Sequence, residues 1–129
     1  MANLFTRFLT RRNKNRALAE FVSCWDTLEI LVITVFKSKT VTEEDLQTYA
    51  QLRAWLLAHY PQWEADLRPL WAPTLVGGQP APEDPFRRIF SAETAETFLT
   101  DWVAMQNLAA AREALNQLVI SISGVSVSQ

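Results

Sequence analysis

The chain has 129 residues, 49% of them hydrophobic and 20% charged, with a formal net charge of −2 at pH 7. This length and composition predict one globular domain over residues 1–129 and exclude a mainly disordered chain. The slightly negative charge argues against a protein whose surface is largely covered by nucleic acid.

The chain contains one cysteine, Cys24, and one histidine, His59. A single cysteine excludes a disulfide within the chain, and the two residues together cannot supply the usual ligands of zinc. No Glu-x-x-His motif is present, so a carboxylate metal site of the kind found in helical bundles has no support. We therefore expect no metal and no cofactor.

The first sixteen residues are basic, with no acid before Glu20. Apolar residues between the cations predict a short amphipathic helix over about residues 3–13, which loosens at residues 13–15. The segment lacks the apolar region and cleavage site of a secretory signal, so we expect a cytoplasmic protein. The five cations that could meet an anionic surface are Arg7, Arg11, Arg12, Lys14 and Arg16.

The clearest periodicity in the chain predicts a helix over residues 17–38. Apolar residues recur there at helical spacing for more than five turns. The β-branched run 31–35 resembles a strand, but the spacing upstream favours a helix. Ile30, Leu31 and Ile33 lie outside the main stripe, which predicts a central helix with a narrow exposed side. The stripe consists of Leu18, Phe21, Val22, Trp25, Leu28, Val32, Val35 and Phe36.

A second helix is predicted over residues 43–68, which makes an antiparallel hairpin with the first. Thr42 and Asp45 have the spacing of a capping box, and three acids follow Thr42 where the helix dipole favours them. Pro61 continues or kinks this helix, and Pro69 is expected to stop it.

Residues 72–85 contain four prolines and two glycines and predict a long extended loop. Asp84 followed by Pro85 predicts the start of a short helix over residues 85–90. Ser91 then caps a long helix predicted over residues 92–121. The whole pattern indicates an all-α fold, four-helix-bundle-like, with the N-terminal helix as its fourth member.

One acid and one base fall inside the apolar stripes of the predicted hairpin. Glu29 lies between Trp25 and Val32, and Arg53 lies in the stripe of the second helix at a similar height along the hairpin. Because an isolated buried charge is costly, we expect a buried Glu29–Arg53 pair, with Arg112 able to join or replace Arg53. The pair would fix the register of the hairpin or, alternatively, bind a polar ligand group in a core pocket.

Five tryptophans in a short chain raise the question of a contact surface. Trp55 lies away from the main stripe of its helix, near Leu52, so it marks either a contact surface or a helix covered on two sides. Trp63 and Trp71 would extend the same patch beside the Pro-rich loop.

No motif commits the chain to a reaction, so we expect no enzymatic activity. His59 is expected at a helix end, and Cys24 is expected as a small buried hydrophobe. The first hypothesis is a non-enzymatic helical-bundle interaction protein that self-associates or docks on a larger protein. The alternatives are peripheral binding of an anionic membrane or nucleic acid through residues 1–16, and a hydrophobic small-ligand site in the bundle core.

Overall fold

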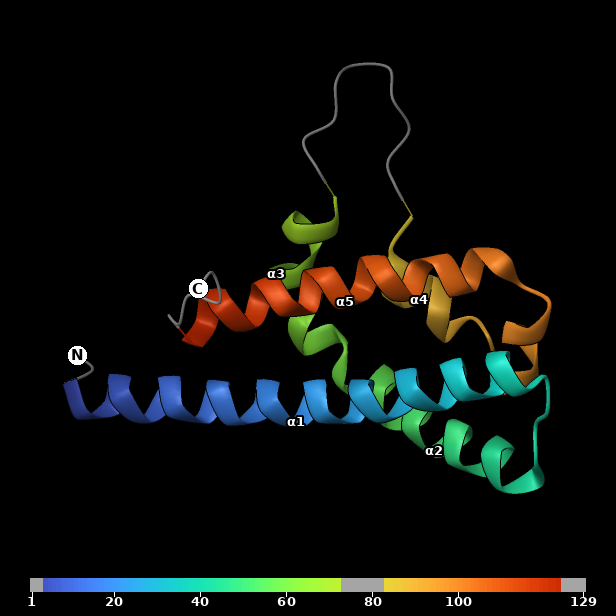
Figure 1. The fold of residues 1–129 in the computed structure, drawn as a ribbon. Coiled ribbons are helices and arrows are strands. Elements are labelled where there is room, and N and C mark those ends of the chain that lie inside the picture. Colours follow the sequence, from blue (N-terminus) through green and yellow to red (C-terminus); the bar gives the residue numbers. More distant parts are fainter. Residues whose placement is uncertain (1–3, 73–82, 124–129) are drawn as a thin grey trace, which may run out of the picture.

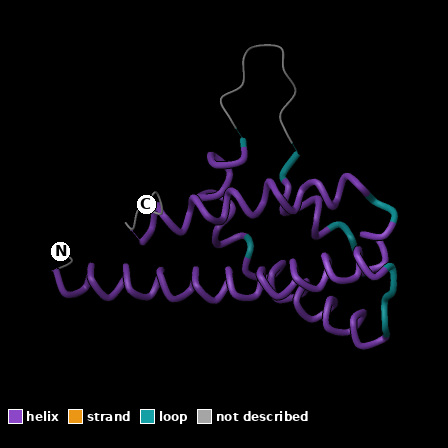
Figure 2. The backbone as a smooth tube through the Cα atoms, in the orientation of Figure 1, coloured by secondary structure: helices purple, strands orange, loops and turns teal. Residues whose placement is uncertain are grey.

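The computed structural model describes residues 4–72 and 83–123, and the side chains of residues 13–72 and 83–122. The described residues are helical apart from turns and short loop segments, with no strand among them (Figure 2). The predicted all-α fold is therefore confirmed. The elements are α1 (Leu4–Ser38), α2 (Glu43–His59), α3 (Pro61–Trp71), α4 (Pro85–Phe90), the 3₁₀ helix η1 (Ala95–Leu99) and α5 (Trp102–Ser123).

The two longest helices, α1 and α5, run antiparallel, with α2 packed below α1 and α3 and α4 packed behind α5 in the view of Figure 1. Helix α1 contacts α2 and α5, while α3 and α4 both pack on α5. The arrangement is four-helix-bundle-like, with α1, α2, α3 and α5 as its members. The fourth member is thus α3, and not a separate N-terminal helix over residues 3–13.

Helix α1 is continuous over 35 residues, which corrects the predicted break at residues 13–15. No glycine or proline occurs between Leu4 and Ser38, and an asparagine costs an α-helix only about 0.5 kcal/mol relative to alanine. Its first turns extend beyond the end of α5 (Figure 1). The helix ends at Ser38, after which Lys39 has a left-handed backbone conformation with φ of 59°.

The predicted helix 43–68 is divided into α2 and α3 at Tyr60. The capping box is confirmed: the Asp45 amide donates to Thr42 Oγ1 over 3.0 Å, and the Thr42 amide donates to Asp45 Oδ2 over 3.0 Å. Pro61 cannot donate a backbone hydrogen bond, so α2 ends at His59 and Pro61 opens α3. Pro69 does not stop the helix as expected, since α3 continues to Trp71.

The start of α4 agrees with the sequence, but the helix predicted over 92–121 begins ten residues later. Asp84 Oδ1 accepts hydrogen bonds from the amides of Phe86 (2.9 Å) and Arg87 (3.3 Å). The cap of α5 is Asp101, which accepts a 3.1 Å bond from the Ala104 amide, and not Ser91. The preceding residues turn back toward the core through η1, which buries Ala95 and Phe98.

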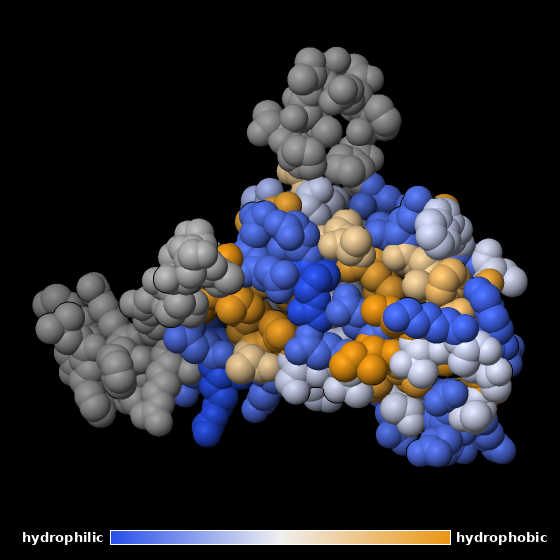
Figure 3. Space-filling model, in the orientation of Figure 1, coloured by the Kyte–Doolittle hydropathy of each residue, from blue (hydrophilic) through white to orange (hydrophobic). Residues whose placement is uncertain are grey.

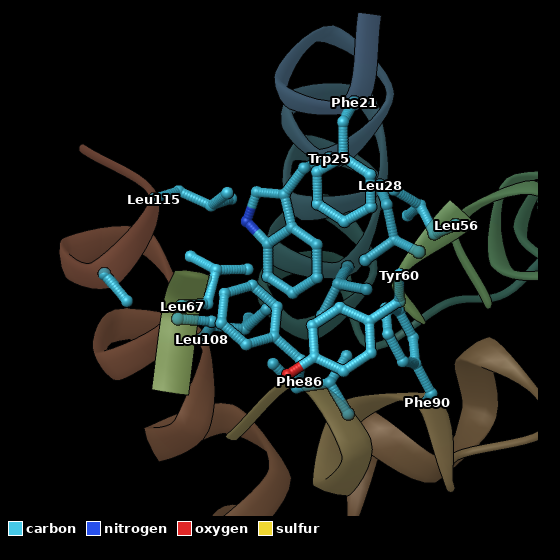
Figure 4. Close-up of a cluster of buried hydrophobic side chains, with 14 of the residues drawn as sticks. Phe21, Trp25, Leu28, Leu56, Tyr60, Leu67, Phe86, Phe90, Leu108 and Leu115 are labelled. Atoms are coloured by element: carbon cyan, nitrogen blue, oxygen red, sulfur yellow. The ribbon is translucent and has the colours of Figure 1, made fainter. Parts of the chain in front are cut away.

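The core is centred on the indole of Trp25, which is fully buried (Figure 4). The Trp25 ring lies 5.2 Å from that of Phe86 and 6.1 Å from that of Phe90, measured between centroids. Tyr60 stacks on Phe86 at 5.2 Å. These contacts bring α1, α4 and the α2–α3 bend together around one aromatic cluster.

Three side chains from the α2–α3 region hold the segment that includes α4. The Tyr49 hydroxyl donates to the Ala92 carbonyl over 2.7 Å, and Arg53 Nε donates to the Phe90 carbonyl over 2.7 Å. The Tyr60 hydroxyl donates to Asp84 Oδ2 over 2.6 Å. These bonds provide partners for polar groups that would otherwise be buried alone.

Candidate interaction surface

The predicted Glu29–Arg53 pair is wrong, because each residue has a different partner. Glu29 Oε2 accepts hydrogen bonds from Arg112 Nη2 (2.8 Å) and Nε (3.2 Å). Arg53 instead bonds the carbonyl of Phe90. Arg112, the alternative base, has thus replaced Arg53, because α5 covers the side of α1 that carries Glu29.

Asp26 joins this ion pair through Arg112 Nη2, so two carboxylates of α1 share one guanidinium of α5. The side chains are 18% exposed for Glu29, 27% for Arg112 and 47% for Asp26, so the group lies at the edge of the core. Partial burial would lower the pKa of Arg112, but the hydrogen bonds and charges of Glu29 and Asp26 outweigh it and raise that pKa. Two negative charges against one positive charge leave the cluster with one excess negative charge.

The four residues of the predicted aromatic patch do not form one surface. Trp63 is 1% exposed and belongs to the core, which excludes it as a contact residue. Trp71 is half-buried at the end of α3. Leu52 and Trp55 lie together on α2, where both are half-buried and line an open groove of about 770 Å³ between α1 and α2.

The α1–α2 groove also contains Cys24, and its edge carries Arg16 and Glu20. Partial burial raises the pKa of the Cys24 thiol. His59, at the end of α2 as expected, stacks on Trp55 with ring centroids 3.9 Å apart, and its Nδ1 lies 2.8 Å from the Trp55 carbonyl. The histidine is therefore held by local contacts within α2, and no nucleophile–base pair occurs among the contacts of the described residues.

Among the described side chains, the most exposed large apolar ones lie on α1 and at the start of α5. Ile30 is 65% exposed, Trp102 is 61% exposed and Val103 is 48% exposed. The Trp102 ring lies 6.2 Å from that of Phe36, which is half-buried. We call Ile30, Ile33, Phe36 and Trp102 the α1–α5 face.

The α1–α5 face is part of a longer apolar seam. Figure 3 shows hydrophobic side chains gathered along the line between α1 and α5, interrupted by hydrophilic ones. Beyond the Arg112 cluster, an open groove of about 360 Å³ is lined mainly by apolar side chains, which include Val22, Val119 and Ile122.

The sequence did not reveal this face, because Ile30 was assigned to a helix with only a narrow exposed side and the last long helix was predicted to start at residue 92, ten residues before Trp102. Asp101 was the available signal. Asp101 caps α5 by accepting a hydrogen bond from the amide of Ala104, three residues later. A helix that starts after Asp101 has Trp102 in its first turn, where the side chain points away from the core.

Of the predicted basic residues, Arg7, Arg11 and Arg12 have side chains outside the described residues. Lys14 Nζ lies 3.9 Å from Asp66 Oδ2, with both side chains more than 40% exposed, and Arg16 is exposed beside the α1–α2 groove. Most of the predicted loop 72–85 also lies outside the described residues.

In the part of the chain that the structure describes, no helix has a stretch long and apolar enough to cross a bilayer. Within the same part, no three side chains of His, Cys, Asp or Glu converge as metal ligands would. Comparison with models of known protein families, with curated proteins and with solved structures gave no match to this chain.

Proposed function

We propose that this chain is a non-enzymatic, cytoplasmic helical interaction protein that binds a protein surface through the α1–α5 face. The observation that carries the proposal is the exposure of Ile30 (65%) on α1 and of Trp102 (61%), whose ring lies 6.2 Å from that of the half-buried Phe36. Burying such side chains in a complex contributes about 25 cal/mol per Å² of apolar area, and tryptophan is enriched among the residues that dominate binding energy.

The Arg112 cluster gives this surface a polar part beside the apolar one. Interfaces of this kind combine an apolar centre with charged groups at the rim, and the rim sets specificity and association rate. Asp26 is the most exposed member of the cluster and lies one turn before Ile30 on α1.

Photo-crosslinking in the cells that make the protein tests the proposal. A benzophenone amino acid replaces Ile30 or Trp102 in the full chain, and exposed Gln62 on α3 serves as the control position. We expect protein adducts at positions 30 and 102 and few or none at position 62. Equal labelling at all three positions, or no protein adduct at 30 and 102, would contradict the proposal.

A second function is favoured by the continuity of α1. The helix runs unbroken from Leu4 and its first turns extend past the end of α5, so the basic segment belongs to a projecting helical arm (Figure 1). We propose as the alternative that this arm binds phosphate groups, of anionic lipid or of nucleic acid.

The alternative is tested with the full chain in which Arg11, Arg12 and Lys14 are changed to alanine. Binding to vesicles containing phosphatidylserine and to a DNA oligonucleotide is measured at low and high salt, with Arg68→Ala as the control. Salt-sensitive binding to one of the two probes, lost in the triple variant alone, would support the alternative and identify the source of phosphate. Equal binding by the triple variant and the original chain would refute it.

A further inference from the structure

The outward side of α1 carries a stripe of four residues that is complementary in charge to an antiparallel copy of the same stripe. Asp26, Ile30, Ile33 and Lys37 are separated by four, three and four residues. At 100° per residue they leave the helix within about 60° of one another. In chain order the stripe is acid, apolar, apolar, base, so an antiparallel copy of it presents base, apolar, apolar, acid.

We infer that the protein binding surface proposed above takes a second copy of this chain, with the two α1 helices packed antiparallel about a two-fold axis between Leu31 and Val32. In this register, Ile30 of one copy faces Ile33 of the other, and Asp26 of one copy faces Lys37 of the other. A two-fold contact is isologous, so each of these pairs forms twice. The inference rests on the proposed function, since it names the partner of the same face.

The charges of the described residues support this register. The cluster of Asp26, Glu29 and Arg112 has one excess negative charge, and Asp26 is its most exposed member. Lys37 is exposed and makes no ion pair with any described side chain. The two charges lie eleven residues apart on α1, about 16 Å, so each can meet its opposite on an antiparallel copy.

The same register covers Trp102, the most exposed aromatic side chain among those that the structure describes. Trp102 lies beside Phe36, and Phe36 is at the height of Thr27 on the second copy. Trp102, on the α5 side of the contact, then lies at the height of Asp26 and Glu29 on the other α1. Ile30 and Trp102, the two most exposed large apolar side chains of the described residues, are therefore buried by one contact.

The contact is small, because it consists of about three helical turns and one tryptophan from each copy. It falls below the roughly 1,200–2,000 Å² of stable protein complexes, so we expect a dissociation constant on the order of micromolar or weaker. Lys37 and Asp26 contribute mainly to the choice of the antiparallel register, because other registers that place like charges opposite each other oppose association.

Analytical ultracentrifugation of the full chain over a wide concentration range tests the inference. We expect the original chain to form dimers as concentration rises. Lys37→Glu alone and Asp26→Lys alone should each weaken the dimer about tenfold or more, because each places like charges opposite each other twice. A 1:1 mixture of the two variants should form a heterodimer, since every facing pair is then of opposite charge. Arg68→Glu has the same change in net charge as Lys37→Glu and should dimerise as the original chain does.

Circular dichroism checks that each variant keeps its helices, because Asp26→Lys places a cation beside Arg112. If that variant fails to fold, Ile30→Glu replaces it, since residue 30 is exposed; both Ile30→Glu and Lys37→Glu must then lose the dimer while Arg68→Glu keeps it. A chain that stays monomeric at all concentrations, or a dimer insensitive to Lys37→Glu, would overturn the inference. Crosslinks from positions 30 and 102 to other proteins would, in that case, still support the proposed function.

Discussion

The hydroxyl of Tyr60 donates a 2.6 Å hydrogen bond to Asp84, whose other carboxylate oxygen caps α4. Asp84 thus connects the α2–α3 bend to a helix that follows it by more than twenty residues. Burial first, and then the hydrogen bond and charge of Asp84, raise the pKa of Tyr60 far above its ordinary value. Burial likewise raises the pKa of Tyr49, although Arg53 opposes the shift.

These two residues are the only tyrosines of the chain, so alkaline titration reports on the folded state directly. Because both pKa values are raised in the folded protein, the stability linked to them is complete below the ordinary tyrosine pKa of about 10 and is lost as pH rises further. We expect tyrosinate absorbance to appear together with loss of helical circular dichroism, in one cooperative step. A gradual titration near pH 10 with the helices intact would contradict this prediction.

Tyr60→Phe separates the hydrogen bond from the titration. At pH 7 this variant should lose about 1 kcal/mol of unfolding free energy, the usual contribution of one buried hydrogen bond. Above pH 10 its stability should fall less steeply than that of the original chain, because one ionising group has been removed. Denaturant unfolding at pH 7 and at about pH 10.5 measures both effects.

Local signals in the sequence predicted the helix starts at Thr42 and at Asp84. In each case a capping side chain bonds amides within three residues of itself, so the geometry depends on little beyond the neighbouring sequence. The helix cap predicted at Ser91 is not formed, because the local contacts of this serine are different. Ser91 also has the right residue type, but its hydroxyl donates to the Arg88 carbonyl at the end of α4.

The partner of Glu29 could not be predicted with the same success. The helical wheel placed Glu29 beside the core, but the choice between Arg53 and Arg112 depends on which helix covers that side of α1. Arg112 lies 83 residues further along the chain, and no local pattern places α5 on that side. The same limitation applies to Trp63, which was predicted to extend the aromatic patch but is buried in the core on α3, after the break at Tyr60.

The interactions of Asp101 lead us to expect that the folded protein loses stability at acidic pH. The hydrogen bond from the Ala104 amide, followed by the bond from Arg88, lowers the pKa of this carboxyl. A lowered pKa contributes stability above the ordinary carboxyl pKa of about 4, and that stability is lost as pH falls through the lowered value. Asp101→Ala should therefore reduce the melting temperature at pH 7 and lose this difference near pH 2. The prediction fails if the variant and the original chain melt together at pH 7.

Lys39 tests the cost of a left-handed residue at the end of α1. Its φ of 59° is unfavourable for a residue with a Cβ, while its ammonium lies 3.9 Å from the centre of the Phe36 ring. Lys39→Ala removes the cation–π contact and keeps the backbone cost, whereas Lys39→Gly removes both. We expect the glycine variant to be more stable than the alanine variant by about 0.5–1 kcal/mol in urea unfolding. Equal stability of the two variants would show that the backbone at this position is unstrained.

Arg112 gives the sharpest test of the α1–α5 seam. Arg112→Ala leaves Glu29, whose side chain is 18% exposed, without its cationic partner, so we expect a loss of about 1–2 kcal/mol of unfolding free energy. Lys14→Ala is the matched control, because the Lys14–Asp66 pair has a 3.9 Å separation and two exposed side chains, and its loss should cost less than about 0.5 kcal/mol. The double variant Arg112→Met, Glu29→Gln should recover part of the loss, since the more buried carboxylate is then neutral and only the more exposed Asp26 stays without its partner. If Arg112→Ala were no more destabilising than Lys14→Ala, the cluster would contribute no more than an exposed ion pair, and α5 would be held on α1 by its apolar contacts alone.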